Sequence, residues 1–266
     1  MVHVDDCVFT GSSAELISDY KSKFNDWYVL TNLGPISWLL GIKVTWDRDN
    51  RTISLSQTTY IESILERYAL TSARAYAMPM VPRVLYSRDQ SPSTPQEADR
   101  MRNVPYREAI GSLMYASLMT RPDITFGVVT LLQFLDNPGD AHWEAVKHIL
   151  CYLSGTKTLA LTYGEERHDL LGYTDADGAT QEHRRAISGY SFLIDGRAIS
   201  WSSKKQELVT LSTAEAEYVA VTHAAKEAIW LRRLIHELFP LLARPTTLYC
   251  DNQSVLKLIE DDNYQA

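Results

Sequence analysis

Residues 198–220 read AISWSSKKQELVTLSTAEAEYVA and decide the fold of the second half of the chain. The stretch joins a short apolar strand, a polar reversal and the start of a long helix. Counted from Glu217, apolar residues recur along that helix with the 3.6-residue period of one helix face, at Val221, Ala224, Ala228, Leu231 and Ile235. Glu217 therefore heads the face of the helix that we expect to be buried.

A carboxylate at the head of an apolar stripe needs a partner. The neighbouring acid, Glu215, heads a row of mixed polar and apolar residues, which predicts that Glu215 faces water and Glu217 faces inward. Ser212 or Thr213 can cap the helix, so both acids lie close to its start. A lone acid there is commonly satisfied by the helix dipole. The surrounding sequence makes Glu217 a candidate functional residue instead.

Strand patterns surround this helix. They cover residues 170–175, 188–194, 197–202 and 246–250. Asp195-Gly196, between two of these runs, is a strong hairpin signal. Because a strand, the long helix and another strand follow one another, we expect a parallel pair of strands, with ligands at the carboxyl ends. Residues 165–266 are thus predicted to form a mixed sheet with helices.

Three acids occupy comparable places in this arrangement. Asp175 and Asp251 follow strands, and Glu217 lies in the first turn of the crossover helix. Three carboxylates brought together repel one another by roughly 4 kcal/mol per pair at an effective dielectric constant of 20, so the cluster needs a cation. Oxygen ligands suit Mg²⁺ or Mn²⁺, and two such ions about 4 Å apart promote phosphodiester hydrolysis. Asp177 has the same strand parity as Asp175, so periodicity leaves both open.

The first half of the chain contains two further units and a linker. Residues 1–77 open with VHVDD, a hairpin pattern with Asp5 and Asp6 at its tip, although aspartate is also an ordinary turn residue. Residues 78–105 hold five prolines among polar residues and form the predicted linker. Residues 106–164 form a predicted helical connection, because helical patterns cover residues 107–119, 123–135 and 141–153.

The composition limits which binding partners and which cellular compartment we expect for the protein. A net charge of −7 argues against a generally basic nucleic-acid binder, so any such contact depends on local basic groups. Lys204 and Lys205, in the reversal beside the acids, are candidate phosphate contacts, although two lysines in a turn are usually just solvated. There is no membrane-length apolar run and no signal-peptide layout, which predicts an intracellular protein of the cytoplasm or nucleus. Three cysteines without metal-finger spacing indicate buried free thiols in a reducing compartment: Cys7, Cys151 and Cys250.

Several ordered motifs carry a resemblance to a known family. GYTDADGA, the run from RRAISGYSFLIDG to IWLRRLI, and LYCDNQSVLKL are similar to the ribonuclease H domain of copia-type retrotransposon Pol polyproteins. VHVDD resembles the YVDD box of the family's reverse transcriptase palm. LGPISWLLGIKV, ISLSQTTYIESILERYAL, YREAIGSLMYASLMTRPDI and NPGDAHWEAVKHILCYLSGT resemble the rest of the palm and the connection. The resemblance implies an α+β or α/β chain, with a partial palm, a helical connector and an incomplete ribonuclease H-like domain.

The resemblance also assigns roles to residues. It implies that Asp175, Glu217 and Asp251 are ribonuclease H metal ligands, which favours Asp175 over Asp177. It further implies that Asp5 and Asp6 are the paired aspartates of the polymerase. The cofactor would be Mg²⁺ or Mn²⁺, and the partners would be an RNA–DNA hybrid or other nucleic acid and the remainder of the polyprotein.

Departures from the family pattern limit the expected activity. His3 stands where the family has Tyr, the chain begins at the palm box, and it stops before the fourth ribonuclease H aspartate. Asp261 and Asp262 follow the last helix too closely to replace that aspartate. We therefore expect no independent DNA synthesis from this chain and weak ribonuclease H activity at most. The alternative is a decayed, non-catalytic retroelement remnant that binds nucleic acid weakly.

Overall fold

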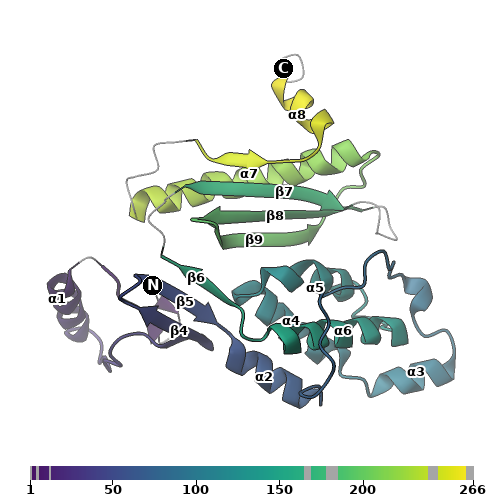
Figure 1. The fold of residues 1–266 in the computed structure, drawn as a ribbon, viewed down its shortest axis with the longest axis horizontal. Coiled ribbons are helices and arrows are strands. Elements are labelled where there is room, and N and C mark those ends of the chain that lie inside the picture. Colours follow the sequence, from purple (N-terminus) through teal and green to yellow (C-terminus); the bar gives the residue numbers. More distant parts are fainter. Residues whose placement is uncertain are drawn as a thin grey trace.

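The computed structural model describes residues 2–3, 6–11, 13–164, 169–177, 185–238 and 245–261. Within these residues the protein is a mixed α/β structure with one two-stranded and two four-stranded sheets. In Figure 1 the N-terminal sheet lies near helix α1 (Ala14–Asn25), a group of helices lies next to this sheet, and the C-terminal sheet with helix α7 (Thr213–Leu238) lies above both. The mixed α/β class expected from the sequence is confirmed.

The N-terminal part begins with the predicted hairpin. Strands β1 (Val2–His3) and β2 (Asp6–Cys7) pair antiparallel, with His3 opposite Asp6. Helix α1 (Ala14–Asn25) follows, and then strands β3 (Trp38–Leu39), β4 (Ile42–Asp47) and β5 (Thr52–Ser56). The fourth strand of this sheet, β6 (Ala160–Tyr163), arrives about a hundred residues later and pairs with β5. The helical group is therefore an excursion between two neighbouring strands.

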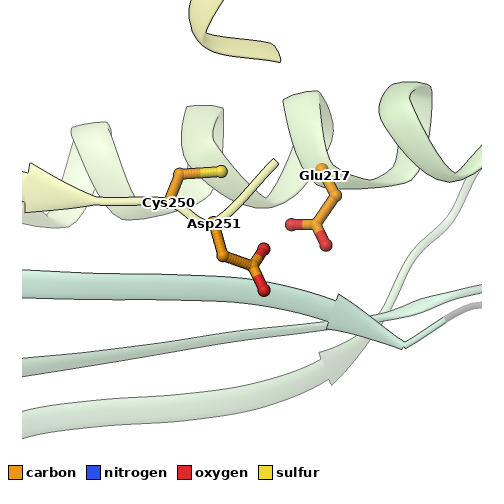
Figure 2. Close-up of side chains that lie close together, drawn as sticks. All are labelled: Glu217, Cys250 and Asp251. Atoms are coloured by element: carbon orange, nitrogen blue, oxygen red, sulfur yellow. The ribbon is translucent and has the colours of Figure 1, made fainter. Parts of the chain in front are cut away.

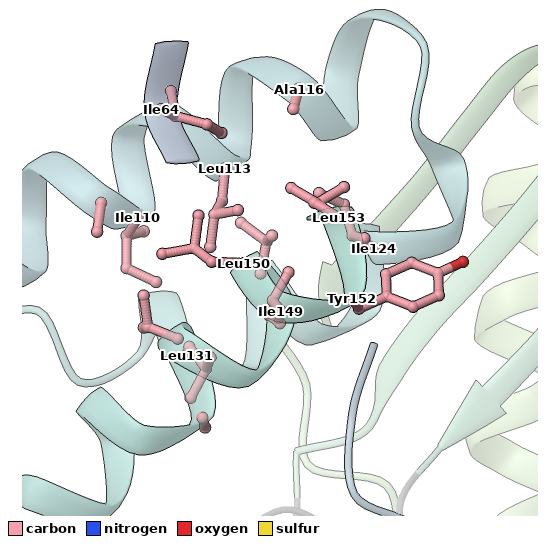
Figure 3. Close-up of a cluster of buried hydrophobic side chains, with 14 of the residues drawn as sticks. Ile64, Ile110, Leu113, Ala116, Ile124, Leu131, Ile149, Leu150, Tyr152 and Leu153 are labelled. Atoms are coloured by element: carbon pink, nitrogen blue, oxygen red, sulfur yellow. The ribbon is translucent and has the colours of Figure 1, made fainter. Parts of the chain in front are cut away.

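The helical group forms around one apolar core. Its elements are α2 (Thr58–Arg67), the 3₁₀ turn η1 (Arg88–Gln90), α3 (Pro95–Arg102), α4 (Tyr106–Met119), the 3₁₀ turn η2 (Pro122–Ile124), α5 (Thr125–Leu132) and α6 (Asp140–Thr156). Three of these confirm the helical patterns predicted after residue 106. Figure 3 shows their buried side chains meeting between the helices, including Ile110, Leu113, Leu131, Ile149 and Leu150. Burying each such side chain contributes about 1.5–3 kcal/mol.

The Pro-rich segment predicted as a linker packs on helix α6. Tyr86 is buried and belongs to the helical core. The imidazole of His142 accepts a hydrogen bond from the Gly139 amide at 2.9 Å and donates one to the carbonyl of Ser87 at 3.1 Å. His148 likewise donates to the carbonyl of Met78 at 3.0 Å. The first part of the segment is thus attached to α6 at Met78 and at Ser87.

A buried ion pair connects η2 to helix α6. The Arg121 side chain is 1% exposed, and its guanidinium donates to both carboxylate oxygens of Asp123, at 3.0 and 2.7 Å. It also donates to Thr156, and the Tyr152 hydroxyl donates to Asp123 at 2.6 Å. Burial disfavours the charged form of Asp123, but these hydrogen bonds outweigh it and lower the pKa of the carboxyl.

The C-terminal sheet carries the predicted acids. Strands β7 (Leu170–Asp177), β8 (Ile187–Ile194) and β9 (Arg197–Lys205) form an antiparallel meander, and the turn between the last two has positive φ at Asp195 and Gly196. That geometry explains the Asp-Gly pair. After helix α7 (Thr213–Leu238), strand β10 (Thr247–Tyr249) pairs parallel to β7, and α8 (Gln253–Glu260) follows. A parallel pair is present as predicted, but it joins β10 to β7 and not to β9, the strand that precedes the helix and lies at the far side of the sheet.

Helix α7 covers one face of this sheet. Phe192 and Leu170 from the strands pack with Ala224, Leu231 and Ile235 from the helix. Gly172 of β7 lies where a Cβ atom would meet Phe192 and Leu248 within 2.5 and 2.8 Å. The absence of a side chain at Gly172 therefore permits the close packing that holds β7, and the acid three residues later, in place.

Candidate metal centre

Glu217 lies at the start of helix α7, which two side chains cap. The Ser212 hydroxyl accepts a hydrogen bond from the Glu215 amide at 3.2 Å, and the Glu215 carboxylate accepts one from the Leu211 amide at 2.6 Å. Glu215 is exposed and serves this cap, whereas Glu217 is 7% exposed. The prediction that Glu217 faces inward and Glu215 outward is confirmed.

The two aspartates come from neighbouring strands. Asp175 lies in β7 opposite Gly189 of β8. Tyr249 of β10 is in register with Tyr173 of β7, so Asp251, two residues after Tyr249, lies beside the position of Asp175. Figure 2 shows the carboxylates of Asp251 and Glu217 facing the same space, one from the end of β10 and the other from α7. The fold therefore brings the three predicted acids to one edge of the sheet.

A cysteine joins this cluster. The ligand atoms of Glu217, Cys250 and Asp251 all lie within 4.8 Å of one another. The sequence predicted Cys250 as a buried free thiol, whereas its side chain is only half-buried. Side chains of consecutive strand residues point to opposite faces, so a continued strand would direct Cys250 and Asp251 away from each other. Strand β10 ends at Tyr249, however, so this alternation no longer holds for the two residues after it.

The electrostatics of the cluster disfavour a bare carboxylate at Glu217. Burial raises the pKa of Glu217 to about 7, the negative charges of Asp175 and Asp251 add to the rise, and a hydrogen bond from the Ala176 amide opposes it. The Oε2 atom of Glu217 is buried and has no hydrogen-bond partner among the described residues. Burial also raises the pKa of the Cys250 thiol, as do the neighbouring acids. A cation would relieve both effects.

A cleft lies beside the acids, between the C-terminal sheet and the helical group. Its volume is about 420 Å³, and its walls include Asp175, Asp177, Ser191, Trp201 and Ser203 from the sheet and Pro122, Thr125 and Phe126 from the helical group. The Trp201 indole donates to the Ser117 carbonyl at 2.8 Å and joins the two parts. Asp175 and Asp177 thus line a cleft that also contains aromatic and hydroxyl groups.

The comparisons with known proteins agree with this architecture. The sequence model of a family described as "Reverse transcriptase (RNA-dependent DNA polymerase)" matches residues 1–82. The Pol polyprotein from transposon TNT 1-94 of Nicotiana tabacum is 42% identical over 267 residues, covering 100% of this chain and 20% of the relative. That from transposon RE1 of Arabidopsis thaliana is 34% identical over 95% of this chain and 17% of the relative.

The chain belongs to the copia-type retrotransposon Pol polyproteins. It spans about a fifth of the length of these two retrotransposon relatives. A protein of Plasmopara viticola named secreted RxLR effector protein 161 is 46% identical over 49% of this chain and 94% of the relative. No solved structure matches the chain significantly. No helix among the described residues is long and apolar enough to cross a membrane.

The reverse transcriptase match includes the predicted polymerase acids. Asp6 is exposed in β2, and Asp5 lies outside the described residues. For this Pol chain the pair therefore stays a prediction from sequence.

The two candidate phosphate-binding lysines lie at the end of β9. Lys205 is half-buried and donates to the Gln133 side chain at 2.5 Å, across the junction with the helical group. Lys204 is exposed, and its ammonium lies 3.5 Å from the carboxylate of Glu207, which is also exposed. Lys204 is accordingly the more accessible of the two cations.

The donor set of this Pol chain fits a divalent cation. Carboxylates are the ligands that Mg²⁺ and Mn²⁺ prefer, and three of them meet here. One oxygen of Glu217, Oε2, is buried there and has no hydrogen-bond partner among the described residues. Asp175 and Asp177 both line the cleft, and the charge of Asp175 also raises the pKa of Glu217. The choice of Asp175 over Asp177 as the ligand stays a prediction from the sequence.

Proposed function

We propose that the chain is the part of a retrotransposon Pol polyprotein that hydrolyses the RNA strand of an RNA–DNA hybrid. The proposal is carried by the buried Glu217, which has an oxygen without a hydrogen-bond partner among the described residues and whose pKa is raised by the charges of Asp175 and Asp251. Such an arrangement is unfavourable for folding unless a bound cation offsets it. A metal-dependent reaction would account for the presence of this unfavourable cluster of acids in the fold.

The roles of the residues follow from their placement. Divalent ions, when bound, orient a water molecule and stabilise the leaving oxygen of a phosphodiester. Asp175 and Glu217 form the inner side of the site, held by the central strand of the sheet and by the capped helix. Asp251 is exposed and forms the side that opens to solvent. The ligands are thus set on rigid elements before substrate arrives.

The cleft beside the acids is the proposed place of the nucleic acid. Its serine hydroxyls, among them Ser191 and Ser203, can donate hydrogen bonds to phosphate or ribose oxygens. Trp201 and Phe126 offer aromatic surface on its two walls, which suits the sugar and base of a single strand. Lys204, at the edge of the sheet, would contact the backbone of the strand.

Residues 1–82 contribute, in this proposal, to the RNA-directed DNA polymerase of the whole polyprotein. Asp5 and Asp6 would bind its metal ions. The relatives are several times longer than this chain, so the polymerase reaction is proposed for the complete protein only.

The test is Mg²⁺-dependent cleavage of a labelled RNA–DNA hybrid by the purified chain. We expect slow cleavage that EDTA abolishes, with little cleavage of single-stranded RNA. Asp175→Asn should abolish it, and Asp177→Asn, a matched change of the same parity on the same strand, should retain it. Equal activity of the wild type and Asp175→Asn would refute the metal site. Complete inactivity of the folded wild type would favour the non-catalytic remnant.

A further inference from the structure

Cys250 gives the candidate metal centre a second set of ligands. Its sulfur and the carboxylate oxygens of Glu217 and Asp251 lie within 4.8 Å of one another. We propose that these three residues form a mixed thiolate and carboxylate site that binds Zn²⁺ in competition with Mg²⁺. Zn²⁺ binding at this site does not depend on the proposed hydrolysis of RNA. Only the inhibition of hydrolysis by bound Zn²⁺ rests on the proposed function.

The buried Glu217 points to a ligand independently of the cysteine. Its side chain is 7% exposed, and Oε2 has no hydrogen-bond partner among the residues that the structure describes. The carboxylate of Glu217 faces the space that the carboxylate of Asp251 also faces (Figure 2). A cation placed there gains a buried carboxylate oxygen, Oε2, that no donor among the described residues satisfies.

The spacing suits a transition metal. Zinc lies about 2.3 Å from a thiolate sulfur and about 2.0–2.2 Å from a carboxylate oxygen, so two ligands of one tetrahedral zinc ion lie about 3.3–3.7 Å apart. The three ligand atoms lie within 4.8 Å of one another, so side-chain shifts of about 1 Å bring them to the spacing that zinc requires. A water molecule would complete the four ligands that Zn²⁺ prefers.

The sulfur decides which metal is preferred. Mg²⁺ takes oxygen ligands in a near-ideal octahedron, whereas thiolates select Zn²⁺ and similar ions. Asp175 is not in the three-ligand group, although its charge acts on Glu217. The two metals would therefore share Glu217 and Asp251 and differ in the third ligand, which is Asp175 for Mg²⁺ and Cys250 for Zn²⁺. Because the thiol must lose its proton, Zn²⁺ binding releases a proton.

The experiment uses Co²⁺ as a coloured substitute for Zn²⁺ and measures Zn²⁺ affinity with a competing chromophoric chelator. We expect a sulfur-to-cobalt charge-transfer band in the wild-type chain that Zn²⁺ removes. Cys250→Ser should lose the band and bind Zn²⁺ at least tenfold more weakly. Cys7→Ser, a change at another half-buried cysteine, is the matched control and should retain both. Asp175→Asn should also retain the band.

The outcomes separate this inference from the proposed function. A band that persists in Cys250→Ser, or an unchanged Zn²⁺ affinity, overturns the site. A band in a wild-type chain that does not cleave the hybrid supports the zinc site and counts against hydrolysis only. If Cys250→Ser does not fold, alkylation of Cys250 in the wild type replaces it: Zn²⁺ should slow that alkylation at least tenfold, and equal rates with and without Zn²⁺ would overturn the proposal.

Discussion

Glu217→Gln is expected to stabilise the metal-free protein at pH 8 and to change its stability little at pH 5. The pKa of Glu217 is raised from 4.5 to about 7 in the folded protein, so the folded state holds this proton more tightly than the unfolded state. The stability linked to the proton is therefore fully present below about pH 4.5 and is lost as the pH rises through 7. Glutamine imitates the protonated form at every pH.

The shift sets the size of the effect. At about 1.4 kcal/mol per pKa unit, it corresponds to roughly 3 kcal/mol in full. Asp251 opens one side of the site to water, which screens part of the interaction. We therefore expect the free energy of unfolding of Glu217→Gln to exceed that of the wild type by about 1–2 kcal/mol at pH 8.

Urea unfolding in EDTA at pH 5 and pH 8, followed by tryptophan fluorescence, measures this difference. Glu237→Gln is the matched control, because Glu237 is an exposed glutamate near the other end of the same helix. Its difference from the wild type should be the same at both pH values. A pH-independent difference for Glu217→Gln as well would refute the reasoning that the cluster disfavours a bare carboxylate.

Three further changes test other parts of the structure. Asp123→Asn should lower the free energy of unfolding by about 3–5 kcal/mol, because it leaves the 1% exposed Arg121 with an unpaired charge; a loss below 1 kcal/mol in urea unfolding would contradict the buried pair. Gly172→Ala should cost about 1–3 kcal/mol, since its Cβ would meet Phe192 within 2.5 Å, and an unchanged thermal midpoint by circular dichroism would show that the packing is looser than described. Trp201→Phe removes the hydrogen bond to Ser117 and should cost about 1 kcal/mol, measured by urea unfolding; equal stability would mean that this contact does not hold the two parts together.

Periodicity made the orientation of α7 predictable. The apolar row that follows Glu217 and the mixed row that follows Glu215 both lie within this one helix. Local spacing alone therefore predicts which of the two acids is buried. The Asp-Gly turn was equally local, since both residues adopt the positive φ that the turn requires. The sequence therefore predicted which acid enters the site and how the adjoining strands are joined.

Long-range pairing and the ends of elements were not predictable in the same way. Nothing local states that β10 lies beside β7, or that the strand ends before Cys250 and so releases this side chain toward the acids. Tyr86 gave no periodic signal in a Pro-rich segment, yet it is buried against the helical group. Each of these features depends on a surface that another part of the chain supplies.

Strand β6 has a consequence for synthesis on the ribosome. Leu55 of β5 pairs with Leu161 of β6, so the N-terminal sheet cannot be completed until the intervening helices have been translated. At about 5–20 residues per second, β5 waits roughly 5–20 s with an open edge. The Tyr163 hydroxyl then donates to the Ala198 carbonyl of β9, which makes the same short strand the joint between the two large sheets. A nascent chain released before this strand would carry an unprotected edge and is expected to aggregate.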